Sequence, residues 1–164
     1  MKFVICTFAR TGSTLLSNII AGLFSPQKPI GFIDKDPNSI LIKDFTDSTF
    51  DVIKSHYVEP LASQQGVDNV YFVTSHRDGF SRINKYPEHW LVFNYQDFLI
   101  DKDPNLAIHF VAGKLKLKFG LVFSESDFAS CRNRLLLMRQ KVKELENKPF
   151  EVYDDFFSYT RRSS

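Results

Sequence analysis

The first 24 residues constrain the fold of this chain more than any other segment. An apolar run rich in β-forming residues (3–8) is followed by a turn-like segment (9–13). Apolar residues then recur at three- and four-residue spacing over 14–24, which predicts a helix with Ser13 or Thr14 as its N-cap. A strand, a tight loop and a helix in this order predict the first half of a βαβ unit, and hence a parallel sheet.

The rest of the chain continues this alternation. The pattern predicts strands over residues 50–54, 70–74 and 150–153 and helices over residues 60–65, 80–85 and 126–147. Residues 90–93 fit either a strand or the start of a helix, 95–100 are ambiguous, and periodicity does not decide between helix and strand over 105–123. We therefore expect one α/β domain over residues 1–164, with a three-layer, mainly parallel central sheet and flanking helices.

The composition argues against several classes of protein. With 43% hydrophobic residues the chain can bury a sizeable core, and 21 basic against 19 acidic residues give a net charge of only +2. This balance predicts no nucleic-acid partner and no membrane partner. Cys6 and Cys131 are too few for a disulfide framework or a structural zinc site, so we expect two reduced, buried thiols. No apolar run is long enough to span a bilayer, so we expect a soluble, cytoplasmic protein.

Basic residues are also concentrated in the predicted helix over 126–147. We expect its basic face to be solvated, and this face comprises Arg132, Arg134, Arg139, Lys141 and Lys143.

Polar and basic groups follow three of the predicted strands, at 10–14, 54–56 and 77–79. Ligands of open parallel sheets bind outside the carboxyl ends of the strands, so these groups are expected to share a site. The first of these segments suits an anion, because Gly12 permits close backbone approach, the following helix offers free N–H groups and Arg10 adds a charge. It lacks the ending of a Walker A loop, and an ordinary glycine-containing turn is the alternative.

The segment FVICTFARTGSTLL, residues 3–16, resembles the 5′-phosphosulfate-binding loop of PAPS-dependent sulfotransferases. The basic residue, glycine and two hydroxyl residues of that loop correspond to Arg10, Gly12, Ser13 and Thr14, and leucines follow, beginning with Leu15. The resemblance implies the P-loop NTPase-like fold of that family.

Two later segments carry the same resemblance. Lys54-Ser55-His56 is similar to the family's Lys-Thr-His segment, in which lysine contacts the sulfuryl group and histidine is the catalytic base. The strand over 71–76 with Arg77 resembles the segment that binds the 3′-phosphate. Where the family usually has a serine this chain has Lys85, and either Lys85 or Ser81 is expected to replace it.

The resemblance implies transfer of a sulfuryl group from PAPS to a hydroxyl or amine of a small-molecule or glycan acceptor, without a metal. It implies that the catalytic residues are His56, Lys54 and Arg10. It implies that PAPS, and its product 3′,5′-ADP, are bound by Arg10, Thr11, Gly12, Ser13, Thr14, Leu15, Arg77 and either Ser81 or Lys85. The acceptor is expected to lie against segments 25–50 and 88–125. The alternatives are a P-loop-type nucleotide kinase or NTPase and a noncatalytic nucleotide-binding or interaction module, and homo-oligomerisation is left open.

Overall fold

The structure is a computed structural model that describes residues 1–33, 35–99, 103–149 and 152–161. Its centre is a five-stranded sheet with the order β2-β3-β1-β4-β5, in which every neighbouring pair is parallel. The strands are β1 (Lys2–Cys6), β2 (Gly31–Phe32), β3 (Val52–Ser55), β4 (Val70–His76) and β5 (Leu91–Asn94). The predicted α/β class with a mainly parallel central sheet and flanking helices is confirmed.

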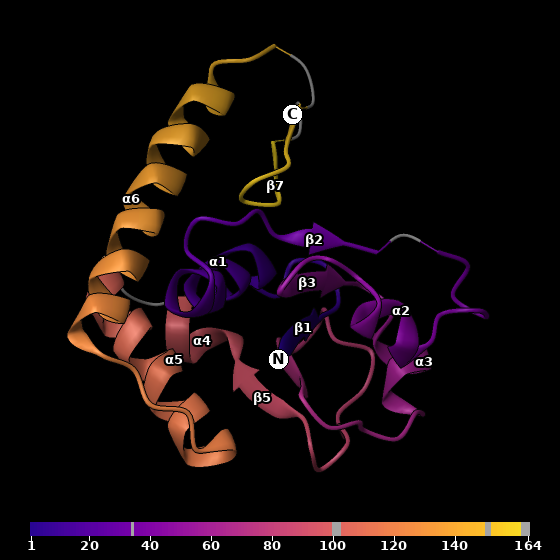
Figure 1. The fold of residues 1–164 in the computed structure, drawn as a ribbon. Helices are drawn as coiled ribbons and strands as arrows, with labels where there is room; N and C mark the ends of the chain where they lie inside the picture. Colours follow the sequence, from indigo (N-terminus) through magenta and orange to yellow (C-terminus); the bar gives the residue numbers. More distant parts are fainter. Residues whose placement is uncertain (34, 100–102, 150–151, 162–164) are drawn as a thin grey trace.

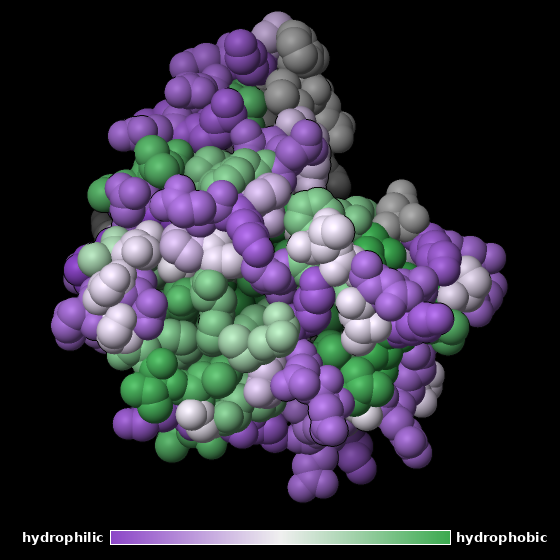
Figure 2. Space-filling view, viewed as in Figure 1, coloured by the Kyte–Doolittle hydropathy of each residue, from purple (hydrophilic) through white to green (hydrophobic). Residues whose placement is uncertain are grey.

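Helices cover both faces of this sheet, which gives three layers (Figure 1). One face packs against α1 (Ser13–Phe24), α5 (Pro104–Phe119) and α6 (Glu125–Glu146), and the other against α2 (Ile42–Thr46) and α3 (Val58–Ala62). The short helix α4 (Tyr95–Leu99) directly follows β5. Figure 2 shows hydrophilic side chains along much of the upper half of α6, which extends beyond the sheet.

Strand β1 is buried on both sides, as the middle strand of a three-layer structure must be. Phe3 and Ile5 belong to the core on the α1 side, whereas Val4 and Cys6 belong to the core on the α2 side. All four are at most 1% exposed, and burying each apolar side chain contributes about 1.5–3 kcal/mol. Because successive side chains of a strand point to opposite faces of the sheet, this one short strand contributes apolar side chains to both cores.

Helices α1 and α6 approach each other closely at Gly22. A Cβ atom at residue 22 would lie 2.8 Å from both the Cα and the Sγ atom of Cys131 in α6, so this crossing requires glycine. Cys131 and Cys6 are both free and buried, as predicted. This close packing makes α1 the element that joins the sheet to α6.

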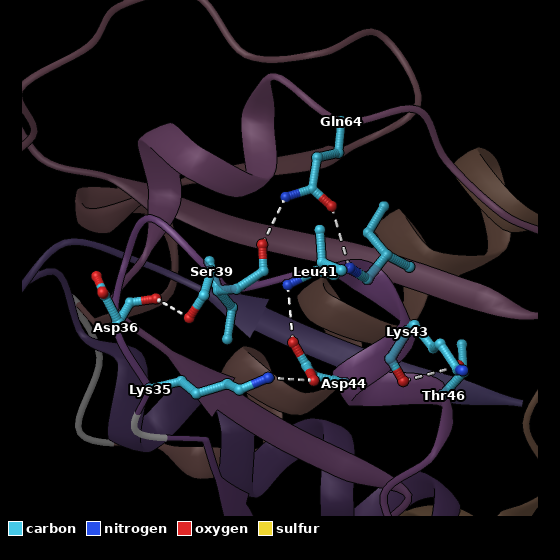
Figure 3. Close-up of polar contacts among 10 residues, drawn as sticks. Lys35, Asp36, Ser39, Leu41, Lys43, Asp44, Thr46 and Gln64 are labelled. Carbon is cyan, nitrogen blue, oxygen red and sulfur yellow. Dashed lines mark hydrogen bonds and ion pairs between the residues drawn. The ribbon is translucent and has the colours of Figure 1, made fainter.

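The segment around α2 is held by side chains that are shown in Figure 3. Asp44 accepts a hydrogen bond from the amide of Leu41 at 2.8 Å and pairs with Lys35 at 2.8 Å, and Lys35 lowers the pKa of this carboxyl. The side-chain amide of Gln64 donates to Ile40 O at 2.9 Å, and its oxygen accepts from the amide of Ile42 at 3.1 Å. The Asp44 bonds stabilise the connection between β2 and β3 internally, and the Gln64 bonds join this connection to the segment that follows α3.

The undecided segment 105–123 is largely helical. Helix α5 begins where the carboxylate of Asp103 accepts a hydrogen bond from the amide of Asn105 at 2.9 Å, with Pro104 at the first turn. It ends at Gly120, whose φ of 71° is in the left-handed region. The next helix, α6, begins one residue before the prediction, and Ser124 and Asp127 cap it reciprocally.

Two local predictions are wrong. Residues 80–85 form no helix; the chain makes a single turn instead, in which Phe80 N and Ser81 N both donate to Arg77 O. The N-cap of α1 is Gly12 with no side-chain hydrogen bond, instead of Ser13 or Thr14. The last predicted strand is confirmed where it is described, as β6 (Val152–Asp154), and residues 150 and 151 lie outside the described residues. It pairs antiparallel with β7 (Tyr159–Arg161), apart from the central sheet.

The expected solvated face of α6 also needs a correction. Arg134 is only 1% exposed, because α1 and the β6–β7 hairpin surround its guanidinium group.

Among the described residues, no helix is both long and apolar enough to cross a membrane.

Candidate functional site

The segments that follow β1, β3 and β4 meet at one edge of the sheet. This follows from the strand order, because β1 lies between β3 and β4 and all three are parallel. Hydrogen bonds join the first segment to the other two: Thr7 N donates to Ser55 O at 3.0 Å, and Ser75 Oγ donates to Thr11 O at 2.6 Å. The three groups of residues predicted to share a site are therefore neighbours.

The loop before α1 exposes backbone N–H groups. Arg10 and Gly12 both have left-handed backbone conformations, with φ values of 62° and 82°. Thr11 between them is buried and anchored, because its Oγ1 donates to Phe8 O at 2.8 Å. No described side chain caps α1, so the N–H groups of its first turn and the positive end of its dipole face the loop. Such an end binds anions, and it is the local arrangement predicted from the sequence.

Lys54 brings a charge to this helix end from the neighbouring strand. Its side chain is 6% exposed, and Nζ donates to Thr14 Oγ1 at 3.3 Å and to Ser158 O at 3.1 Å. Burial lowers the pKa of Lys54 to about 8. A lysine with two uncharged oxygen partners and little hydration gains from a nearby anion.

His56 lies two residues further on and is exposed. Its Nδ1 is 2.8 Å from Thr7 O. A carbonyl oxygen only accepts, so Nδ1 carries the hydrogen and a neutral His56 has its lone pair on Nε2. The ring also contacts Phe32 edge-on, with centroids 5.9 Å apart. This arrangement fixes one tautomer, and it is the tautomer in which Nε2 can accept a proton.

Arg77 lies on the other side of β1, after β4. Its guanidinium donates to Arg10 O at 2.9 Å and lies between the rings of Phe80 and Tyr95, whose centroids are 4.1 and 4.0 Å from Cζ. Ser81 lies one turn after Arg77, and its hydroxyl accepts a hydrogen bond from the Arg77 amide at 3.0 Å. The structure thus places Arg77 against the loop before α1, and the Ser81 hydroxyl helps to hold the turn that carries Arg77.

Three adjoining clefts surround these residues. The β2 cleft has a volume of about 620 Å³ and is lined by Pro29, Ile30, Gly31, Phe32, Phe50, Lys54, His56, Tyr153, Asp155, Ser158 and Thr160. The α1 cleft has about 570 Å³ and is lined by Ala9, Arg10, Ser13, Thr14, Lys54, His56, Glu146, Ser158, Tyr159 and Thr160. The α6 cleft has about 340 Å³ and is lined by Arg10, Gly12, Thr14, Leu15, Arg77, Tyr95, Met138, Val142 and Tyr159.

The clefts share walls. Lys54 and His56 line both the β2 cleft and the α1 cleft, whereas Arg10 and Thr14 line both the α1 cleft and the α6 cleft. Lys85 is exposed and lines none of the three. The catalytic residues predicted from the sequence, together with Arg77, therefore surround one continuous depression, and Lys85 lies apart from it.

The β6–β7 hairpin is a part of the site that the sequence did not predict. Ser158, Tyr159 and Thr160 form one wall of the α1 cleft, and Ser158 also binds Lys54 through its carbonyl. Phe50 and residues 29–32, from the segment 25–50 expected to contact an acceptor, line the β2 cleft, whereas no described residue of 88–125 does. Tyr153, Asp155, Ser158 and Thr160 of the hairpin line the β2 cleft as well.

Comparisons of this chain with protein-family models, with curated protein sequences and with solved structures find no match. The geometry of the described residues is therefore what bears on the function.

Proposed function

We propose that this chain is a sulfotransferase that moves a sulfuryl group from PAPS to a hydroxyl or amine acceptor, with the P-loop-type sulfotransferase fold. One observation carries the proposal: a buried lysine and a histidine with a fixed tautomer lie together where a cleft at an uncapped helix end meets a second cleft. Transfer between two oxygens needs two substrates side by side, with charge stabilisation and a base at their junction.

The α1 cleft suits the nucleotide. The N–H groups of the first turn of α1, the hydroxyl groups of Ser13 and Thr14 and the charge of Arg10 would hold the 5′-phosphate. Arg77, which donates to Arg10 O, would bind the 3′-phosphate. The adjoining α6 cleft, which Leu15 lines, would receive the adenine ring of the nucleotide. When bound, PAPS supplies an activated sulfuryl group, and Lys54 would stabilise the charge on its oxygens. Glu146, a carboxylate in the α1 cleft, faces this space too.

The β2 cleft suits the acceptor. Phe32, Phe50 and Tyr153 provide aromatic surfaces, and His56 lies where this cleft joins the α1 cleft. In the tautomer set by Thr7 O, Nε2 of His56 would take the proton of the acceptor hydroxyl or amine as the new bond to sulfur forms.

Sulfuryl transfer can be measured with PAPS labelled with ³⁵S and a panel of phenols, alcohols, amines and oligosaccharides. We expect labelled product from at least one class, with stoichiometric release of 3′,5′-ADP. The matched control is His89→Gln, because His89 is exposed, lines none of the three clefts and offers the same chemical change as His56→Gln. Transfer of label by His56→Gln at the wild-type rate would overturn the assignment of the base.

The same preparation distinguishes the two alternative functions. A nucleotide kinase would be stabilised against heat by ATP with magnesium and not by 3′,5′-ADP. A noncatalytic nucleotide-binding module would bind 3′,5′-ADP yet release no label from PAPS with any acceptor of the panel. Either result would contradict the proposed activity.

A further inference from the structure

The turn of the β6–β7 hairpin presents three consecutive backbone carbonyls to three different elements. The pairs are Arg134 Nη2 with Phe156 O at 3.0 Å, Asn18 Nδ2 with Phe157 O at 2.7 Å and Lys54 Nζ with Ser158 O at 3.1 Å. These donors come from α6, α1 and β3. A turn held at three successive carbonyls cannot move by one residue without losing all three bonds.

Arg134 is the centre of this arrangement. It is 1% exposed, and its other donors contact Asn18 Oδ1 at 3.1 Å, Pro26 O at 3.0 Å and Lys28 O at 2.7 Å. A charge that is removed from water persists only where its donors are satisfied, and the planar guanidinium provides several in a fixed fork. Burial lowers the pKa of Arg134 to about 10, which leaves the group charged at neutral pH.

Aromatic rings of the hairpin complete the packing. The centroid of Phe156 lies 4.4 Å from Cζ of Arg134, and that of Phe157 lies 5.4 Å away. Ser158 follows with a φ of 52°, a left-handed conformation that needs support from its surroundings. The hydroxyl of Tyr153 lies 3.0 Å from Ser158 Oγ. Arg134 therefore holds the side of the turn that precedes Ser158.

We propose that Arg134, acting through Asn18 and the hairpin, is a positioning residue for Lys54: it holds the Ser158 carbonyl on Nζ and keeps water from the ammonium group. The inference rests on the proposed function in one respect: there, Lys54 binds the anionic group of the substrate. Without this clamp the hairpin would lift from α1, and the α1 cleft and the β2 cleft would lose their common wall.

The surroundings of Lys54 allow this effect to be measured. Lys54 shares its clefts with Arg10, His56, Tyr153, Asp155, Tyr159 and, at the end of α6, Glu146. Desolvation accounts for the lowered pKa of Lys54, and water that enters after displacement of the hairpin would raise it. A loss of global stability alone leaves the pKa of the folded state unchanged, so this readout separates positioning from a merely structural role.

The experiment is NMR titration of the uncomplexed chain labelled with ¹³C at lysine Cε. The signal of Lys54 is assigned by its loss in Lys54→Arg. We expect a titration midpoint near pH 8 in the wild type and in Arg139→Gln, which removes the same charge from an exposed position on α6. In Arg134→Gln and in Asn18→Ala we expect a midpoint higher by about one pH unit or more.

A midpoint unchanged in the folded variants would overturn the inference. Asn18→Ala removes one bond to the hairpin and leaves Arg134 in place, so it provides the decisive result if Arg134→Gln does not fold. An equal upward shift of the Lys54 midpoint in Arg139→Gln would also overturn the inference, because the shift would then result from the loss of a positive charge and not from displacement of the hairpin. No nucleotide is added, so a failure of the chain to bind 3′,5′-ADP contradicts the proposed function and leaves this result intact.

Discussion

The β2 cleft and the α1 cleft meet at Lys54 and His56 but differ in what surrounds these two residues. In the α1 cleft they face Arg10, several hydroxyl side chains, Glu146 and the open end of a helix. In the β2 cleft they face Asp155 and a mainly apolar wall that includes Phe32 and Phe50. An anion gains from the first surroundings and an apolar or aromatic molecule from the second. Under the proposed function, this difference would allow one lysine and one histidine to act on two chemically unlike ligands where the two clefts meet.

The largest effect is expected from a substitution of His56, which lies where the two clefts meet. His56→Gln retains a polar side chain but removes the base, and we expect sulfuryl transfer to fall by about 10²–10⁴-fold. Affinity for 3′,5′-ADP, measured by calorimetry, should stay within about twofold, because the groups proposed to bind its two phosphates, the N-terminus of α1 with Arg10 and Arg77, do not include His56. A parallel loss of affinity and turnover would mean that His56 holds the nucleotide.

The next largest effect is expected on nucleotide binding alone. Arg77→Ala is expected to weaken 3′,5′-ADP binding by about 10- to 100-fold, the value of one charge-assisted contact, and 5′-AMP binding much less. Arg82→Ala is a matched control, because Arg82 is an exposed arginine close along the chain that pairs with Glu59 at 2.9 Å. Equal losses for both nucleotides in Arg77→Ala would contradict a 3′-phosphate role.

A smaller effect is expected on the acceptor side. Phe32 is 45% exposed and lies against the ring of His56, so Phe32→Ala removes apolar surface from the β2 cleft alone. We expect the KM for an apolar acceptor to rise about five- to tenfold, with the affinity for 3′,5′-ADP unchanged. A change in nucleotide affinity of similar size would show that the two clefts are not separate in function.

The smallest effect is a pH dependence of nucleotide binding. Burial lowers the pKa of Lys54 from 10.5 to about 8, so the unliganded folded chain loses this charge as the pH rises through 8. An anion favours the charged form, and affinity for 3′,5′-ADP is therefore expected to fall several-fold between about pH 7.5 and about pH 9. Calorimetry at several pH values checks this, and Lys54→Met should not show the fall. The same fall in Lys54→Met would assign it to another group.

Much of the sheet could be predicted because its signals are local. The run over 70–74 gave β4, since Val70, Phe72 and Val73 are buried as a continuous apolar strand requires. Helix α5 could have been predicted from Asp103 and Pro104 at its start and Gly120 at its end, had these outweighed the alternating lysines. The helix predicted over 80–85 is absent because Phe80 and Ser81 bond back to the Arg77 carbonyl in a single turn, a local arrangement that sequence periodicity does not encode.

The hairpin wall of the site could not be predicted for a different reason. Arg134 and Asn18 are separated by 116 positions, and Lys54 and Ser158 by 104. The charge pattern alone treats Arg134 as one basic residue among several. The helical period places it three residues after Cys131 and four before Met138, on the apolar side of α6, but it does not show which distant groups would satisfy a buried guanidinium there. The residues of the loops at 10–14, 54–56 and 77–79 were predicted to share a site because a parallel sheet brings strand ends together without long-range information.

The central proposal, that the α1 cleft and the adjoining α6 cleft together bind a nucleotide with two separate phosphates, can be tested by calorimetric titration of the whole chain. The ligands are 3′,5′-ADP, 5′-AMP and ATP with magnesium at one pH and one salt concentration. We predict that 3′,5′-ADP binds at least about tenfold more tightly than the other two, because Arg77 adds a second phosphate contact. Tighter binding of ATP with magnesium, or no binding of 3′,5′-ADP, would contradict the account.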